Sequence, residues 1–245
     1  MGGCQGTRKN YPEKTQKECR EFEDRQKMCD KDWKLMTAFV RCYSQHDGKV
    51  PEENILKIME EMGLKDTYNN NDTKLKTMLN EFIGEEEPQN EFFVYFVLFM
   101  CGGRENEKAT YFCMMLNDMD SKKNEVSGAR LRKVLEKLMH LAIMSIPEKV
   151  GKDKMDFYDE MIAVDVETMV KLWCPGCEQE NVPNQMIIDW FSKDHSFTTG
   201  EARAVVLKNI KAAKAHETLA KAKTVSEGAK GTAEEKPVNP SKLTS

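Results

Sequence analysis

The sequence lacks any run of about 18 apolar residues, so no membrane-spanning helix is expected. The apolar stretch at residues 92–101 is too short to cross a bilayer, and we predict a buried helix there. No apolar segment follows Met1, which argues against a secretory signal peptide. The chain also lacks a charge excess, because 37 Lys and Arg stand against 41 Asp and Glu for a net charge of −4. This near balance argues against general binding of nucleic acid.

Signatures of catalysis are missing as well. There is no glycine-rich phosphate loop, no Gly-x-Ser-x-Gly elbow and no His-Glu-x-x-His pair. The four histidines are scattered without the spacing of a metal site or a catalytic triad: His46, His140, His195 and His216. We therefore do not expect an enzyme. The eight cysteines, with no secretory signal ahead of them, are expected to be reduced thiols.

Helical periodicity dominates what is present. Ile55, Ile58, Met59 and Met62 recur at the spacing of one helix face, and the segment around Leu131–Met139 repeats the pattern. Strand-like alternation is nearly absent, and apolar residues make up 40% of the chain, enough for a core. The sequence predicts an all-α fold.

Composition divides the chain into four parts. Residues 1–20 are small, polar and basic, and we expect a flexible segment. Two helical blocks follow at 21–103 and 104–211, separated by a Gly-Gly break. Residues 212–245 are rich in Ala and Lys and are predicted to be a disordered tail, because they cannot bury enough apolar surface to offset chain entropy.

The joins between the helices repeat one pattern. From Tyr43 a polar loop of about twelve residues has Gly48 at its sixth place and Val50 at its eighth, before the next helix. This helix–loop–helix unit resembles an EF-hand. Similar units follow, with loops counted as 83–94, 118–130 and 174–186. Resemblance to a calmodulin-like protein implies two lobes of paired hands.

The loops depart from the ligand pattern for calcium, which requires oxygen atoms at several places and a bidentate Glu at the last. Their first places hold Tyr43, Ile83, Asp118 and Cys174, and their closing places hold Asn54, Val94, Arg130 and Met186. None of the closing residues is a carboxylate. The hands are therefore predicted to be degenerate, with Asp118 and Asp120 of the third loop as the candidate calcium ligands, at low affinity.

Paired hands without metal remain a scaffold for a helix. The myosin light chains are a similar case, in which hands that largely lost calcium still bind partner helices, and the resemblance implies such an adaptor here. The partner would be an amphipathic helix of another protein. The candidate groove residues are Phe92, Phe96, Phe99, Met100, Phe112, Met115 and Met139.

The first ten residues, MGGCQGTRKN, predict lipidation. Gly2 is the residue that N-myristoylation requires, although Gly6 stands where the usual pattern has Ser or Thr. Cys4 is placed for palmitoylation, and a second acyl chain is needed for stable membrane binding. We expect a protein that is anchored by lipid at the cytoplasmic face of a membrane and is partly cytosolic.

Two alternatives stay open at this point. The first is a working calcium sensor or buffer that uses Asp118 and Asp120 with backbone carbonyls. The second is thiol redox chemistry at Cys174 and Cys177, which form a Cys-x-x-Cys pair without a surrounding βαβ pattern. Zinc binding by the same pair would need further ligands, and His195 is the one candidate.

Overall fold

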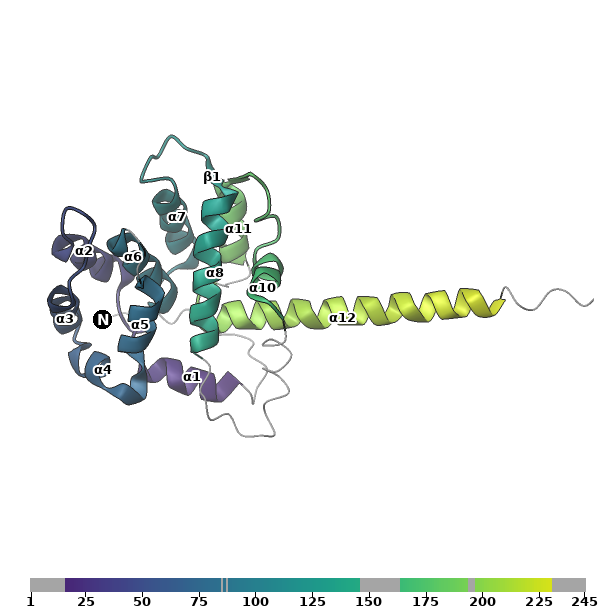
Figure 1. The fold of residues 1–245 in the computed structure, drawn as a ribbon, viewed down its shortest axis with the longest axis horizontal. Coiled ribbons are helices and arrows are strands. Elements are labelled where there is room, and N and C mark those ends of the chain that lie inside the picture. Colours follow the sequence, from purple (N-terminus) through teal and green to yellow (C-terminus); the bar gives the residue numbers. More distant parts are fainter. Residues whose placement is uncertain (1–15, 85, 87, 146–163, 194–196, 231–245) are drawn as a thin grey trace, which may run out of the picture.

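The computed structural model describes residues 16–84, 86, 88–145, 164–193 and 197–230. The described chain is mostly helical, and the predicted all-α class is confirmed. Its elements, drawn in Figure 1, are α1 (Gln16–Arg25), α2 (Trp33–Tyr43), α3 (Glu52–Glu61), α4 (Lys65–Asn69), the 3-10 turn η1 (Asn71–Thr73), α5 (Leu75–Ile83), α6 (Gln89–Met100), α7 (Glu105–Leu116), β1 (Glu125–Ser127), α8 (Gly128–Met144), α10 (Val166–Trp173), β2 (Asn181–Pro183), α11 (Asn184–Lys193) and α12 (Thr199–Lys230).

Local sequence explains where several helices begin. The Asp32 carboxylate accepts hydrogen bonds from the backbone N–H groups of Lys34 and Leu35 and so caps α2. Asp165 does the same for α10 through the N–H of Thr168. α6 starts directly after Pro88, whose fixed φ suits the residue before a helix.

The helices form four helix–loop–helix units: α2–α3, α5–α6, α7–α8 and α10–α11. In the second pair of units, β1 and β2 join the two loops as an antiparallel ribbon with Val126 opposite Val182. The Gly128 N–H extends this contact by donating to the Glu180 carbonyl at 2.8 Å. A Cβ at Gly128 would lie 1.8 Å from the carbonyl oxygen of Gln179, so this close approach requires glycine.

The loops of the first pair are also adjacent, but no strand forms between them within the described residues. The Asn90 N–H donates to the Gly48 carbonyl at 2.9 Å, and the Val50 N–H donates to the side-chain oxygen of Gln89. Gly48 has φ +82°, and a Cβ there would lie 2.5 Å from Cβ of Pro88. A single backbone hydrogen bond and one side chain therefore replace the ribbon of the second pair.

The second loop differs from its prediction. The sequence predicts a full-length loop over 83–94, but α5 ends at Ile83 and α6 begins at Gln89. The connection therefore covers only residues 84–88. The physical reason is that the apolar run after Pro88 gains more by continuing as a buried helix than by forming a polar turn, since residues 92–100 are all buried.

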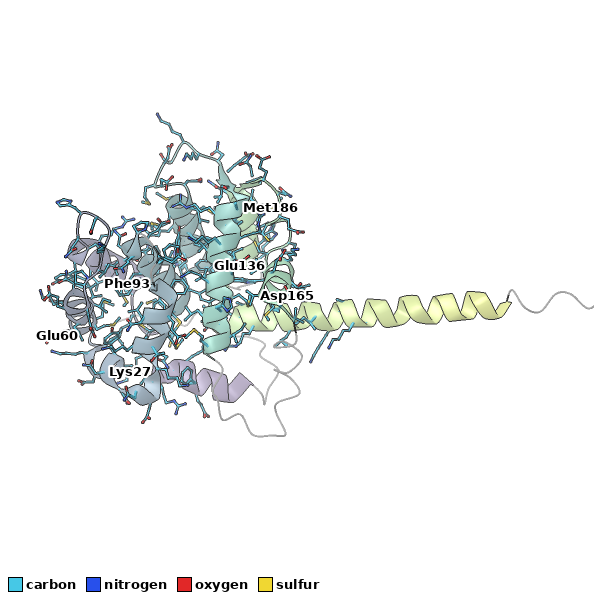
Figure 2. All side chains as sticks on the ribbon, viewed as in Figure 1. Lys27, Glu60, Phe93, Glu136, Asp165 and Met186 are labelled. Atoms are coloured by element: carbon cyan, nitrogen blue, oxygen red, sulfur yellow. The ribbon has the colours of Figure 1, made fainter. Side chains whose placement is uncertain are left out.

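The two pairs of units share one continuous core. The ring centroids of Phe99 and Trp173 lie 5.6 Å apart, and those of Tyr95 and Phe112 lie 5.4 Å apart, so α6 contacts the second pair along its length. Phe93 of α6 is fully buried, and Figure 2 shows it among the helices while Glu60 lies at the outer edge. The expected segments 21–103 and 104–211 thus meet across an extensive apolar contact.

α12 has two parts with different surroundings. Its first turns lie against α8 and α10, with α1 also in contact, and its buried residues are Ala202, Arg203, Val206, Leu207 and Ile210. The rest of the helix extends away from the body into solvent (Figure 1). The sequence predicts a disordered tail over 212–245, but the structure has helix to Lys230, and residues 231–245 lie outside the described residues. The Ala- and Lys-rich composition has high intrinsic helix propensity, which accounts for the difference.

Candidate functional site

The first loop is closed by its own hydrogen bonds. The Asn54 side-chain amide, at the place where calcium would need a carboxylate, donates to the Tyr43 carbonyl at 2.8 Å. The Asp47 carboxylate accepts from the Lys49 N–H at 3.0 Å, and this bond lowers the pKa of Asp47. The Tyr43 carbonyl and the Asp47 carboxylate, which could serve as metal ligands, therefore already accept hydrogen bonds from the protein.

The short second connection, between α5 and α6, is bound to α8 by ion pairs. Glu86 forms ion pairs with Lys133 at 2.6 Å and with Lys137 at 3.4 Å. The hydrogen bond from Lys133 lowers the pKa of this carboxyl group. The Lys137 ammonium also donates to the Phe82 carbonyl at the end of α5. These contacts join the first pair of units to the second.

The third loop contains the strongest electrostatic arrangement near the candidate calcium ligands. One nitrogen of the Arg130 guanidinium lies 2.5 Å from Asp118, and the other lies 2.6 Å from Glu91 of α6. Tyr95 donates its hydroxyl to the same Glu91 oxygen at 2.6 Å. The hydrogen bond from Arg130 holds the pKa of Asp118 below its usual value. A fixed cation thus already pairs with both carboxylates, and the Lys123 ammonium lies 3.7 Å from Asp118 as well.

Asp120, the other candidate calcium ligand, stabilises the turn. Its carboxylate accepts from the Lys122 N–H at 3.0 Å. Asp118 and Met119 both have left-handed backbone, with φ +56° and +61°, so the turn reverses sharply between the two candidates. Over the described ranges, no three His, Cys, Asp or Glu side chains come together in a group that could hold a metal ion.

The fourth loop buries its two cysteines. Cys174 and Cys177 have no exposed surface, and the Cys177 N–H donates to the Cys174 carbonyl in a tight turn. Burial raises the pKa of both thiols, so both stay protonated near neutral pH. A redox nucleophile needs the opposite shift, and this geometry therefore gives no support to the redox alternative.

The seven residues expected to line a partner groove are all part of the core. Phe96, Phe99, Phe112 and Met139 have no exposed surface, and Phe92, Met100 and Met115 are between 5% and 8% exposed. In the second pair of units, α12 of the same chain packs against both α8 and α10. Gly2 and Cys4, the predicted lipidation residues, lie outside the described residues.

Two buried cations that hold α12 were not identified from the sequence. The fully buried Lys108 ammonium donates to the carbonyls of Cys101 at 2.9 Å and Phe197 at 3.0 Å. Burial lowers the pKa of Lys108 to about 8. Lys108 lies four residues before Phe112 and eight before Leu116, which places it on the apolar face of α7. This spacing is the feature of the sequence that indicates its burial.

Arg203 is the second buried cation. Its guanidinium pairs with Glu23 of α1 at 2.6 Å and donates to the Ala142 carbonyl near the end of α8 at 2.7 Å. Thr199 donates its hydroxyl to the same carboxylate. Nothing local in the segment around Arg203 predicts burial, because its partners lie 61 and 180 residues away in sequence.

No protein-family model, curated protein or solved structure matches this chain. Across the part of the chain that the structure describes, no helix combines the length and the apolar character needed to cross a membrane.

Proposed function

We propose that this protein is an EF-hand-like adaptor that works without calcium. It is anchored at the cytoplasmic face of a membrane through acyl groups on Gly2 and Cys4, and it binds a helical segment of a partner protein. Four helix–loop–helix units, arranged as two pairs with adjacent loops, support the EF-hand part of the proposal.

The ion-pair cluster of Arg130 with Asp118 and Glu91 is the observation that carries the calcium-independent part. In a calcium sensor the divalent ion binds the loop carboxylates reversibly, and the helices respond to its loss. Here a guanidinium covalently attached to the chain supplies the positive charge. It stays on the chain at any calcium concentration and pairs with the carboxylates that calcium would need.

α12 supports the helix-binding part of the proposal. The turns of α12 from Thr199 to Ile210 bury an apolar face against α8 and α10. Amphipathic helices bind hydrophobic grooves through side chains at such helical spacing. This scaffold therefore has helix pairs that hold a further helix by packing alone, without a metal.

Calorimetric titration of the full chain with calcium tests the proposal. We expect no binding heat up to about millimolar calcium, because so many ligand places lack oxygen donors. Arg130→Glu should introduce weak calcium binding, since it replaces the fixed cation by a carboxylate beside Asp118 and Glu91. Lys57→Glu on α3 makes the same change of charge away from the loops and should remain silent.

The outcome that would contradict the proposal is calcium binding by the wild-type chain that disappears in Asp118→Ala. That result would establish the calcium-sensor alternative. The membrane part has a separate test, in which the chain is expressed in cells that contain both a myristoyl-transferase and a palmitoyl-transferase and is then floated with anionic vesicles. Gly2→Ala should abolish both acylation and flotation, whereas Cys4→Ser should keep the myristoyl group and reduce flotation, because one acyl chain binds only marginally.

A further inference from the structure

The surface between α2 and α7, where the two pairs of units meet, contains two open hollows of about 280 Å³ and about 230 Å³ that share no lining residue. We call this surface the α2–α7 groove, and the residues used below are Trp33, Lys34 and Arg41 with Tyr111, Met114, Met115 and Met119.

The two hollows follow one face of α7. Their lining residues on α7 recur at three- and four-residue spacing from Asn106 to Met115, which is the period of a single helical stripe, and Met119 follows from the turn after the helix. Trp33 at the start of α2 faces Tyr111, with 5.2 Å between ring centroids, and Arg41 near the end of α2 reaches Met119. At about 1.5 Å per residue, the twelve residues of α7 are about as long as three turns of another helix laid beside them.

Methionine makes the lining adaptable. Met114, Met115 and Met119 come from the end of α7 and the turn that follows it. Unbranched thioether side chains fit apolar groups of different shapes, which suits a surface that binds another helix. Met119 is 39% exposed and is one of two large apolar side chains at the surface of the described residues, Leu35 being the other. Its left-handed backbone turns the chain at this point.

Charge distinguishes Arg41 from the other ionised residues of the groove. Lys34 pairs with Glu107 at 2.6 Å, and Arg130 is neutralised by its two carboxylates. The Arg41 guanidinium contacts the sulfur atoms of Met115 and Met119 at 3.5 and 3.6 Å. It also lies 5.3 Å from the Tyr111 ring. It forms no ion pair among the described residues. The Glu91 and Asp118 carboxylates line the same hollow, but both are paired with Arg130, so the Arg41 charge is available to a ligand.

We propose that the α2–α7 groove binds a short amphipathic helix of a partner protein, with a carboxylate of that helix paired to Arg41. The apolar stripe of the partner would cover Tyr111, Met114 and Met119, since Trp33 and Met115 are only 6% and 8% exposed. This inference rests on the proposed adaptor function and gives that function a binding surface and a chemical preference. An Arg–carboxylate pair beside apolar contacts gives specificity as well as affinity.

Two synthetic helical peptides of about 14 residues test the groove. Both carry a leucine stripe at helical spacing, and they differ only in one flanking residue, Glu in one and Lys in its sister. The full chain is labelled with ¹³C in its methionine methyl groups, and each peptide is titrated by NMR. We expect the Glu peptide to shift the methyl signals of Met114, Met115 and Met119 at lower concentration than its sister.

Arg41→Glu provides the charge swap. It should weaken binding of the Glu peptide about tenfold and make the Lys peptide the better ligand, because the pairing is reversed. The Lys57→Glu control should leave both affinities unchanged. Equal affinities of the two peptides that Arg41→Glu does not alter would overturn the proposal.

The NMR signals also separate this inference from the adaptor function. If only methionines of α8 and α10 shift, such as Met139 and Met169, the peptide has replaced α12, and the groove proposal fails while helix binding stands. If no methionine shifts with either peptide, both the groove and the adaptor function are contradicted.

Discussion

The two pairs of helix–loop–helix units hold their loops together in different ways. In the second pair, backbone pairs with backbone through the β1–β2 ribbon, centred on Val126 and Val182. In the first pair, the Gln89 side chain accepts the hydrogen bond of Val50, and one backbone bond remains between Asn90 and Gly48. The helices are nevertheless arranged as pairs in both cases.

Pro88 explains the difference. It has no N–H to donate to a ribbon, and it ends the second connection early by starting α6. The comparison shows that the helical arrangement does not depend on the details of the loops. The loops of the first pair lack a β ribbon, and burial of residues 92–100 of α6 compensates for it. Each fully buried large apolar side chain contributes about 2 kcal/mol to the free energy of unfolding.

The second pair of units is also covered by α12, which packs against α8 and α10. Substitution of Arg203, which anchors α12, is expected to have the largest effect on the free energy of unfolding. Arg203→Met should remove the ion pair to Glu23 and leave that carboxylate without its cation, at a cost of about 3 kcal/mol in unfolding free energy. Hydrogen exchange should then rise in α8 and α10 but not in α3. Equal exchange throughout would show that α12 contributes nothing local to the second pair.

Gly128→Val should break the ribbon of the second pair. Any Cβ there meets the Gln179 carbonyl, and relief of that contact must separate the loops, so we expect a loss of about 3 kcal/mol in urea unfolding. The matched control is Gly63→Ala. Gly63 has φ +63°, but an added Cβ would meet only the Lys31 side chain at 3.8 Å, so the substitution should lower the free energy of unfolding by about 1 kcal/mol. A smaller loss for Gly128→Val than for this control would contradict the role given to the ribbon.

Lys108 joins the end of α6 to the start of α12, and its burial predicts a pH dependence. Its folded pKa of about 8 lies below the ordinary lysine value of 10.5, so the unfolded chain binds more protons between these values. Stability should therefore gain about 2 kcal/mol from this group between about pH 7 and about pH 10.

Lys108→Met should remove that gain. The measurement is the difference in unfolding free energy between the wild type and the variant at the two pH values, which cancels the other titrating groups. Cys101, Glu105 and Glu201 face Lys108, and they are present in both proteins. A difference that stays constant with pH would mean that the lysine titrates normally.

Asn54→Ala should have the smallest effect. It removes the hydrogen bond that closes the first loop and should cost about 1 kcal/mol. Asn184→Ala in the second pair removes bonds to Lys123 and Asn117 and should cost more. Urea unfolding of both variants compares the loops directly, and the reverse order would show that the first pair depends on its loop more than its geometry indicates.

Much of the helical arrangement was predictable from apolar periodicity, because the residues that face the core recur at helical spacing. Ile55, Ile58 and Met59 are buried on α3, and Leu131, Val134 and Leu135 are buried on α8. The early start of α6 was not predicted, because the polar residues before it satisfy a loop pattern equally well. The length of α12 was missed for a similar reason, since low apolar content indicates disorder unless helix propensity is weighed against it.

The candidate site was harder to predict than the helices. The sequence alone determined that calcium ligands are missing at the closing places of the loops, because that depends on residue type and position. Only the tertiary structure decided that Arg130 supplies a cation to Glu91, 39 residues away, and that Arg41 contacts methionines 74 and 78 residues away while forming no ion pair among the described residues. The physical reason is that charge pairing depends on distances between side chains of different helices, and helix packing sets those distances.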